Sequence, residues 1–141
     1  MFIKKAFAKR VNGVSEFVTW VAEVKKNFKY EKDDALGPWF RGQHGDWPLY
    51  PKLYRPEYGG HARVRRDLVE EEIREQFISE AHIFCETIPA GDDDWEWYFL
   101  MQHFGAPTRL LDWTEGALLG LYFSIRGNPG YYNSVVWALV V

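Results

Sequence analysis

The sequence predicts an α+β domain, with helices in the first two thirds packed on a small mixed β-sheet. Three observations predict this class. Apolar residues recur at helical spacing in several segments, and two short β-prone runs lie on either side of the later helices. No internal repeat or linker divides the 141 residues, so a single globular unit is expected. Helices and strands that are segregated along the chain are typical of α+β architecture.

The first helix is expected from Ser15 to about residue 28. Ser15 is a plausible N-cap, and apolar residues recur at helical spacing at Phe17, Val21, Val24 and Phe28. Gly37 and Pro38 then break the chain before a short strand at residues 39–43. Residues 1–36 therefore form an N-terminal helical segment, ahead of a domain that spans residues 37–141.

Residues 45–60 contain three prolines and three glycines, which predicts an irregular loop. Its aromatic residues are expected to hold the loop against the domain; they are Trp47, Tyr50, Tyr54 and Tyr58. A long helix is predicted over residues 67–88, with one apolar stripe. The stripe consists of Val69, Ile73, Phe77, Ala81, Phe84 and Ile88.

Another helix is expected at residues 95–104, capped by Asp92, Asp93 and Asp94 and ended by Gly105 as the C′ residue. Residues 106–114 should be extended or turning. The helix at residues 115–126 is so apolar that we expect it to be buried. A strand at residues 134–141 follows, and because it ends the sequence inside an apolar run, we expect the chain to be a fragment of a longer protein.

The composition excludes several classes. The chain is 47% hydrophobic and 18% aromatic, which favours a packed core over disorder. Its net charge of −3 gives no basic field that would attract nucleic acid or anionic lipid. A single cysteine, Cys85, excludes an internal disulfide. No apolar stretch approaches the roughly 18 residues of a membrane span, and the N-terminus lacks a secretion signal, so a cytoplasmic location without membrane association is expected.

Two motifs place an arginine in an unusual backbone setting: WFRGQ at residues 39–43 and QHFGAPTRLLDWT at residues 102–114. A guanidinium keeps its charge and presents five donors. Arg41 therefore either binds a phosphate or carboxylate, with Gly42 allowing close approach, or pairs with Asp112 inside the fold. These alternatives stay open for Arg41. For Arg109, a local tie to Asp112 is favoured.

Other polar residues of the motifs are weaker candidates. Thr108 and Thr114 suit a ribose or phosphate, but hydroxyls in turns more often bond the nearby backbone. His103 ends a helix and is interpreted as packed near Trp113, whereas His44 lies in a polar stretch that favours a ligand. His82 and Glu86 have the spacing of metal ligands without a third partner, so no metal site is predicted.

The two motifs together resemble the signature of the FRG domain family. The family's Phe-Arg-Gly core corresponds to Phe40, Arg41 and Gly42, and the match continues through Gln43, Trp47, Pro48, Leu49, Pro51, Leu53 and Arg55. The second block matches from Gln102 to Thr114, and ALLGLYF at residues 117–123 is similar to the helix that follows it in the family. The resemblance covers roughly residues 37–141, and members usually continue beyond that point.

A weaker similarity connects this signature to the ADP-ribosyltransferases. It implies an incomplete core of that fold, in which Arg41 holds a phosphate and ribose of NAD and residues 108–114 shape the nicotinamide pocket. A late carboxylate or glutamine would lie beyond Val141, so no catalytic residue is assigned. The resemblance implies a cofactor-binding set of Arg41, Gly42, Gln43, His44, Thr108, Arg109, Asp112, Trp113 and Thr114.

The family resemblance also implies a bacterial or phage protein, such as a toxin or a phage-defence factor, with a nucleotide ligand. The alternative is a non-enzymatic interaction module. In that case the arginines are structural, and the aromatic loop meets a protein or single-stranded nucleic acid through its rings and the basic residues Lys52, Arg55 and Arg63.

Overall fold

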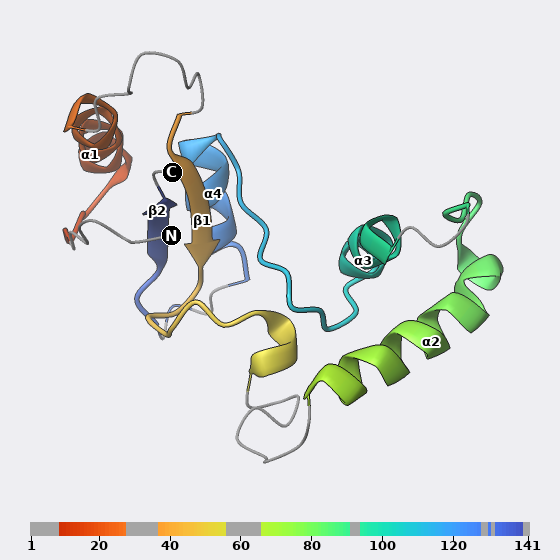
Figure 1. Ribbon diagram of the computed structural model, residues 1–141. Helices are drawn as coiled ribbons and strands as arrows, with labels where there is room; N and C mark the ends of the chain where they lie inside the picture. The colour runs from red at the N-terminus through yellow and green to blue at the C-terminus, as the bar shows by residue number, and fades with distance from the viewer. Residues whose placement is uncertain are drawn as a thin grey trace. The chain divides into compact units, whose positions relative to one another are not determined.

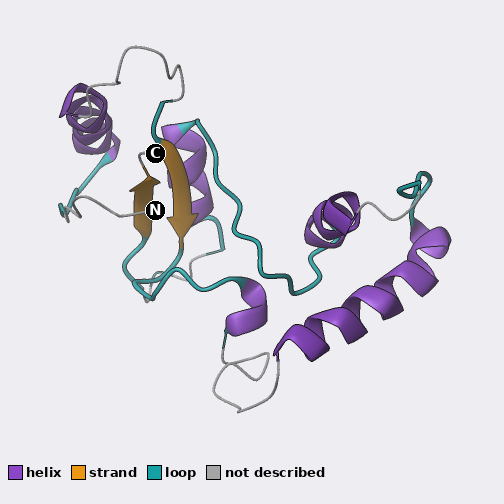
Figure 2. Cartoon of the chain, viewed as in Figure 1, coloured by secondary structure: helices purple, strands orange, loops and turns teal. Residues whose placement is uncertain are grey.

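The computed structural model describes residues 9–27, 37–55, 66–90, 94–127, 130 and 132–139. These residues form an α+β fold, as predicted (Figure 2). The elements, in chain order, are α1 (Val14–Asn27), β1 (Trp39–Gln43), the 3-10 turn η1 (Lys52–Tyr54), α2 (Arg66–Phe84), α3 (Asp94–His103), α4 (Ala117–Ile125) and β2 (Val135–Leu139) (Figure 1). The described part of the chain contains no helix long and apolar enough to cross a membrane.

The chain divides into two compact units. Unit 1 consists of Met1–Asp46 and Trp113–Val141, and unit 2 is the intervening segment Trp47–Asp112. Unit 1 therefore contains α1, both strands and α4, while unit 2 contains η1, α2 and α3.

In unit 1, β1 pairs with β2 in antiparallel register, and Arg41 lies opposite Trp137. On its other edge β1 meets Thr114 through an antiparallel bridge at Phe40. The pairing is antiparallel wherever strands are described, so the predicted mixed sheet is wrong here. The strand prediction at residues 39–43 is confirmed. The second predicted strand is confirmed in Val135–Leu139, while Val140 and Val141 lie outside the described residues.

Helix α4 packs on β1 through two glycines, Gly42 and Gly120. A Cβ added at Gly42 would lie 2.5 Å from the backbone nitrogen of Ser124 and closer still to the carbonyl oxygen of Gly120. A Cβ at Gly120 would lie 3.1 Å from the Cβ of Phe40, which is completely buried. The helix backbone therefore rests directly on the strand, and no side chain fits between them.

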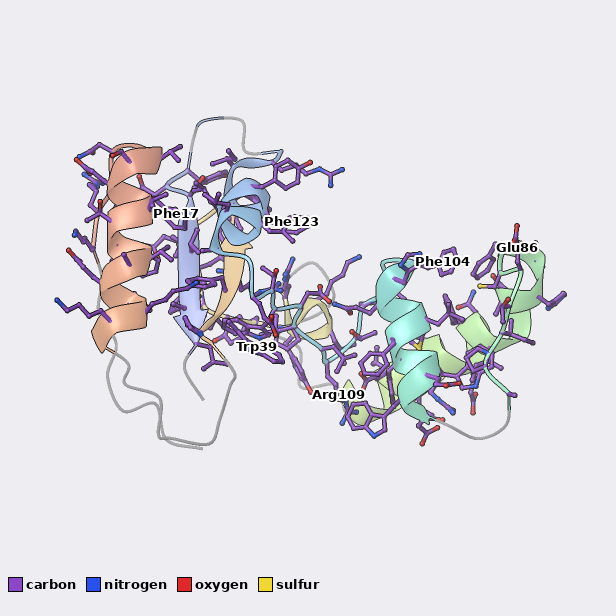
Figure 3. All side chains as sticks on the ribbon, turned by 90° about the horizontal axis from the view of Figure 1, so that it is seen from above. Phe17, Trp39, Glu86, Phe104, Arg109 and Phe123 are labelled. Atoms are coloured by element: carbon purple, nitrogen blue, oxygen red, sulfur yellow. The ribbon has the colours of Figure 1, made fainter. Side chains whose placement is uncertain are left out.

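The prediction that α4 is buried is wrong for its outer face. Only Gly120 and Ser124 of the helix are buried, whereas large apolar residues on the other side are about half exposed. These are Leu118, Leu119, Tyr122, Phe123 and Ile125. Figure 3 shows Phe123 on the side of α4 away from the strands. Gly42 and Gly120 bring α4 close to the sheet, so only a narrow face of the helix contacts the strands.

Helix α1 lies on the β2 side of the strand pair, whereas α4 lies on the β1 side (Figures 1 and 3). Its inner face carries Phe17 and Val24, which are buried. The helix begins at Val14, and Ser15 is inside its first turn, so the predicted Ser15 cap is wrong. Instead the Glu16 carboxylate accepts the backbone N–H of Asn12 at 2.9 Å, which satisfies a donor just before the helix. Phe28 lies outside the described residues.

In unit 2, the C-terminal part of α2 contacts the end of α3 through three phenylalanines. The ring centroids of Phe77, Phe84 and Phe104 lie 5.0–6.2 Å apart, in edge or tilted arrangements, which are the favoured geometries of aromatic pairs. Arg74 of α2 adds an ion pair with Asp94, the first residue of α3. Asp92 and Asp93, the other predicted caps, lie outside the described residues.

Helix α2 ends at Phe84, so the prediction that it reaches residue 88 is wrong. Pro89 disfavours helical backbone at Ile88, and Ile88 is exposed instead of continuing the apolar stripe. Residues 45–55, the described part of the loop before α2, are irregular as predicted, apart from η1. The buried anchor of this loop is Leu53, while Tyr50 is half exposed; Tyr58 and Arg63 lie outside the described residues.

Candidate functional site

The first motif presents two different faces because successive residues of a strand point to opposite sides of a sheet. Phe40 and Gly42 face α4. Trp39, Arg41 and Gln43 share the other face, together with Trp137, the partner of Arg41 on β2. We call these four side chains the Arg41 face. The space that Gly42 leaves is filled by the backbone of α4, so this glycine serves helix packing and leaves no gap for a ligand.

The two motifs meet in unit 1. Phe40 N–H donates to the Thr114 carbonyl at 2.6 Å, and Thr114 N–H donates back at 2.9 Å. In an antiparallel bridge the register runs in opposite directions, which sets Trp113 across from Arg41 on the edge opposite to β2. Arg41 is thus flanked by Trp137 on one neighbouring segment and by Trp113 on the other. Residues about 70 positions apart in the sequence are brought together here.

The Arg41 face is aromatic and partly buried. Trp39 and Trp137 each bury an indole N–H that has no hydrogen-bond acceptor among the described residues. An unsatisfied buried donor costs roughly 1–3 kcal/mol. Gln43 is 5% exposed, and His44, directly after the strand, is exposed. A fixed cation, two indole donors and several rings are thus gathered on one side of the sheet.

In unit 2, Arg109 is held by Glu70, a residue of α2 that sequence analysis missed. The carboxylate of Glu70 is completely buried and accepts both the backbone N–H of Arg109, at 3.0 Å, and its guanidinium. The hydrogen bond that the guanidinium donates to Glu70 raises the pKa of Arg109 above its ordinary value, so the cation is retained. Figure 3 labels Arg109 beside the first turns of α2. Arg109 therefore has a structural partner, but this partner is Glu70, 39 residues away in the sequence, whereas a local tie to Asp112 was predicted.

Sequence spacing contains a signal for Glu70. Glu70 lies three positions before Ile73 and seven before Phe77, so it shares a face of α2 with these two apolar residues. A carboxylate on the apolar face of a helix is buried when the helix packs, and a buried carboxylate requires a cationic or hydrogen-bonding partner.

A chain of hydrogen bonds joins Thr108, Gln102 and Asp112. The Leu110 N–H donates to the Thr108 hydroxyl at 3.3 Å, and that hydroxyl donates to the Gln102 side-chain carbonyl. The Gln102 amide N–H then donates to Asp112 at 2.9 Å. Thr114 also bonds the nearby backbone, because its hydroxyl accepts the Gly116 N–H at 3.1 Å. Both threonines thus shape turns, which was the alternative to ribose or phosphate binding.

Gly105 ends α3 as predicted. Its φ of 78° is in the left-handed region, which glycine adopts without a steric penalty. The Gly105 N–H donates to the backbone carbonyl of Gln102 at 3.0 Å, and the Ala106 N–H donates to the backbone carbonyl of Met101 at 2.9 Å. These are the two hydrogen bonds of a Schellman motif. His103, in the last turn, is exposed, and its ring contacts Phe104 with centroids 5.2 Å apart.

An open pocket of about 330 Å³ lies beside this turn in unit 2, lined by Phe99, Gln102, His103, Leu110, Leu111 and Asp112. Its walls combine apolar side chains with one carboxylate, one imidazole and one amide. Two motif residues that sequence analysis treated separately, His103 and Asp112, thus line one pocket.

The charges near the start of α2 also affect Tyr98. Burial raises the pKa of the Tyr98 phenol above 10.0, and the Glu70 carboxylate raises it further. A group with a raised folded-state pKa stays protonated longer in the folded state than in the unfolded state. Its contribution to stability is therefore present below about pH 10 and is lost as the pH rises through the folded-state pKa.

We therefore predict that Tyr98→Phe makes stability less sensitive to alkali. Urea unfolding at about pH 9 and about pH 11 should show a smaller loss of unfolding free energy for this variant than for the wild type. Tyr50→Phe, at a half-exposed tyrosine, is the matched control and should lose as much as the wild type. Equal losses for all three proteins would contradict the prediction.

The predicted cofactor-binding residues fall in both units. Arg41, Gly42, Gln43, His44, Trp113 and Thr114 belong to unit 1, and Thr108, Arg109 and Asp112 to unit 2. The predicted proximity of Arg41 and Asp112 stays a prediction.

Two basic residues of the alternative nucleic-acid surface donate hydrogen bonds within unit 2. Lys52 donates to the Gly105 carbonyl, and Arg55 donates to the Tyr50 carbonyl. Glu86 follows the end of α2, so it does not lie one helical turn from His82.

A model of the FRG domain matches residues 37–131, which is more than half of the chain. The match includes both motifs and α4, whereas β2 and α1 lie outside it. No curated protein and no solved structure matches the chain.

Proposed function

The chain belongs to the FRG domain family, and we propose that it binds a nucleotide of the NAD class on the Arg41 face, as an ADP-ribosyltransferase-like domain. The observation that carries the proposal is the backbone pairing of Phe40 with Thr114. This pairing sets the arginine of the first motif beside the tryptophan of the second. The ligand is thus proposed to contact both motifs within unit 1.

The chemistry of the Arg41 face fits such a ligand. A guanidinium presents a planar fork of donors that matches the oxygens of a pyrophosphate. Trp113 and Trp137 offer ring faces on which a base or nicotinamide would stack.

The proposal distinguishes the two arginines. Arg109 is paired with a buried carboxylate, so we assign it to the fold. We assign anion binding to Arg41 because the strand register places it between Trp113 and Trp137. Thr108 and Thr114 contribute turn geometry through their backbone bonds. The transferase step would require a group that stabilises an oxocarbenium-like transition state, and we assign that role to no described residue. A role in conflict between bacteria and phage belongs to the same proposal.

The test is a titration of NAD followed by tryptophan fluorescence, with ADP-ribose and nicotinamide as part-ligands. We expect saturable binding of NAD and ADP-ribose by the wild type. Arg41→Ala should weaken it at least tenfold, because hydrogen bonds to charged groups contribute roughly 1.5–3 kcal/mol. Arg41→Lys should recover only part, since it keeps the charge but loses the fork.

Arg10→Ala, at an exposed arginine of unit 1, is the matched control and should bind as the wild type does. Equal affinity of the Arg41→Ala variant and the wild type would overturn the assignment of Arg41. Fluorescence that no nucleotide changes, with a calorimetric titration that is equally flat, would overturn nucleotide binding itself.

A second function, a protein-interaction module, is favoured by the outer face of α4. Five large apolar side chains of that helix are about half exposed, and patches of this kind often mark contacts with other proteins. The two proposals differ in the response to Leu119→Asp. An interaction module would lose its partner on that substitution, whereas nucleotide binding on the Arg41 face should persist.

A further inference from the structure

The outer face of α4 combines exposed apolar side chains with opposite charges at its two ends. Glu115 is exposed directly before the N-cap residue Gly116, and Arg126 is exposed at the C-cap position. Only Gly120 and Ser124 of the helix are buried, so the strands cover the opposite face alone. The large apolar residues between the two charges are Leu118, Leu119, Tyr122, Phe123 and Ile125.

The charges at the ends of α4 are not neutralised within the described part of the chain. Neither Glu115 nor Arg126 forms an ion pair there. The Arg126 guanidinium lies over the Tyr122 ring, 5.7 Å from its centroid, and a ring attracts a cation in this position. The cation is therefore held on the apolar face. Glu115 lies at the helix end where the macrodipole favours a carboxylate.

The order of these residues makes the outer face complementary to a second copy of itself. In an antiparallel pair of α4 helices, the acidic end of each copy meets the basic end of the other. Two ion pairs between Glu115 and Arg126 would then form. A two-fold axis between Leu119 and Tyr122 places Leu119 of each copy against Tyr122 of the other, as an isologous interface requires.

The remaining apolar residues also have counterparts about this axis. Leu118 comes opposite Phe123 of the second copy, and Ile125 comes opposite Gly116, which has no side chain to obstruct it. A parallel pair of α4 helices would instead place like charges together at both ends, which costs free energy. The charges therefore favour the antiparallel arrangement.

The size of this surface is that of a weak dimer. The five apolar side chains are each about half exposed, and their complete burial in two copies, together with the end charges, would remove roughly 1,000 Å² from water. Specific and stable complexes bury about 1,200–2,000 Å². We therefore expect a dimer that dissociates on dilution.

We propose that this chain self-associates through the outer face of α4, in an antiparallel pair with a two-fold axis between Leu119 and Tyr122. The proposal rests on the second proposed function, the interaction module, and identifies its partner as a second copy of the chain. The Arg41 face lies on the side of β1 that faces away from α4, so NAD binding should not depend on the dimer.

The test is sedimentation velocity over a range of protein concentrations, combined with charge reversal. We expect the wild type to shift from monomer to dimer as the concentration rises. Glu115→Lys and Arg126→Glu should each weaken the dimer at least tenfold, because each places like charges at both ends of the pair. An equimolar mixture of these two variants should recover the association, since every end of the mixed pair then joins opposite charges.

Two further variants separate association from folding and from net charge. Arg10→Glu, at an exposed arginine outside α4, changes the net charge as Arg126→Glu does and should dimerise as the wild type does. Leu119→Asp should stay monomeric at every concentration. The circular dichroism spectrum of each variant should match that of the wild type, since all the substituted residues are exposed.

A wild type that stays monomeric at every concentration would overturn the proposal. So would charge reversals that leave the dimer unchanged, or a mixture of the two reversed variants that stays monomeric.

Thiol labelling separates the failure of this proposal from the failure of the interaction module. In a Cys85→Ser background, Leu119→Cys should react rapidly with a maleimide at a concentration where the chain is monomeric. A reactive thiol in a chain that never dimerises would refute self-association alone. A protected thiol in the monomer would show that the chain covers this face itself, and would refute the interaction module as well.

Discussion

The Gly42→Ala variant is expected to lose about 3 kcal/mol or more of unfolding free energy, at the upper end of the range for overpacked sites. The added Cβ would meet backbone atoms of Gly120 and Ser124, which cannot rotate away as a side chain would. Helix α4 would have to move off β1, and Phe40, which is completely buried against it, would lose its cover.

Urea unfolding of the purified variant measures this loss. Gly13→Ala is the matched control, because a Cβ at Gly13 meets no atom within 4 Å, and it should change stability little. Should Gly42→Ala unfold at the same urea concentration as the wild type, the direct contact between α4 and β1 described above would be wrong.

Arg109→Met is expected to cost about 3 kcal/mol, the lower end of the range for breaking a buried ion pair. The lower end applies because the Arg109 side chain is 50% exposed, whereas that of Glu70 is completely buried. The substitution strands the buried carboxylate of Glu70, and this desolvated charge is the main source of the loss. The backbone N–H of Arg109 can still donate to it.

A double-mutant cycle with Glu70→Met isolates this interaction. The double variant has no stranded charge, so it should be more stable than Arg109→Met alone, as is found where both members of a buried pair become apolar. Equilibrium unfolding of all four proteins gives the coupling, which we expect to exceed about 1 kcal/mol. Additive losses would show that Arg109 and Glu70 do not stabilise the fold as a pair.

Local sequence patterns predicted most elements correctly because their signals are local. Gly37 and Pro38 delimit β1, and Gly105 ends α3 in the backbone conformation that favours glycine. The burial of α4 was wrongly predicted, since hydrophobicity says how apolar a helix is and not how much of it a partner covers. A contact made through Gly42 and Gly120 is narrow, and it leaves large residues such as Phe123 half exposed.

The candidate site was harder to predict because its contacts are non-local. Glu70 and Arg109 are 39 residues apart, and a glutamate on a helix usually indicates a solvated face. The bridge between Phe40 and Thr114 depends on strand register, which no single motif contains. The motifs indicated which residues matter, but whether each residue stabilises the fold or binds a ligand depends on its partners in the structure.

The most direct test of this division is thermal unfolding of Arg41→Ala and Arg109→Ala, each with and without saturating NAD. We expect Arg109→Ala to melt well below the wild type without ligand and still to be stabilised by NAD. Arg41→Ala should melt close to the wild type and gain nothing from NAD. The reverse pattern, in which Arg41→Ala unfolds early and Arg109→Ala alone loses the NAD effect, would contradict the assignment of Arg109 to the fold and Arg41 to the ligand.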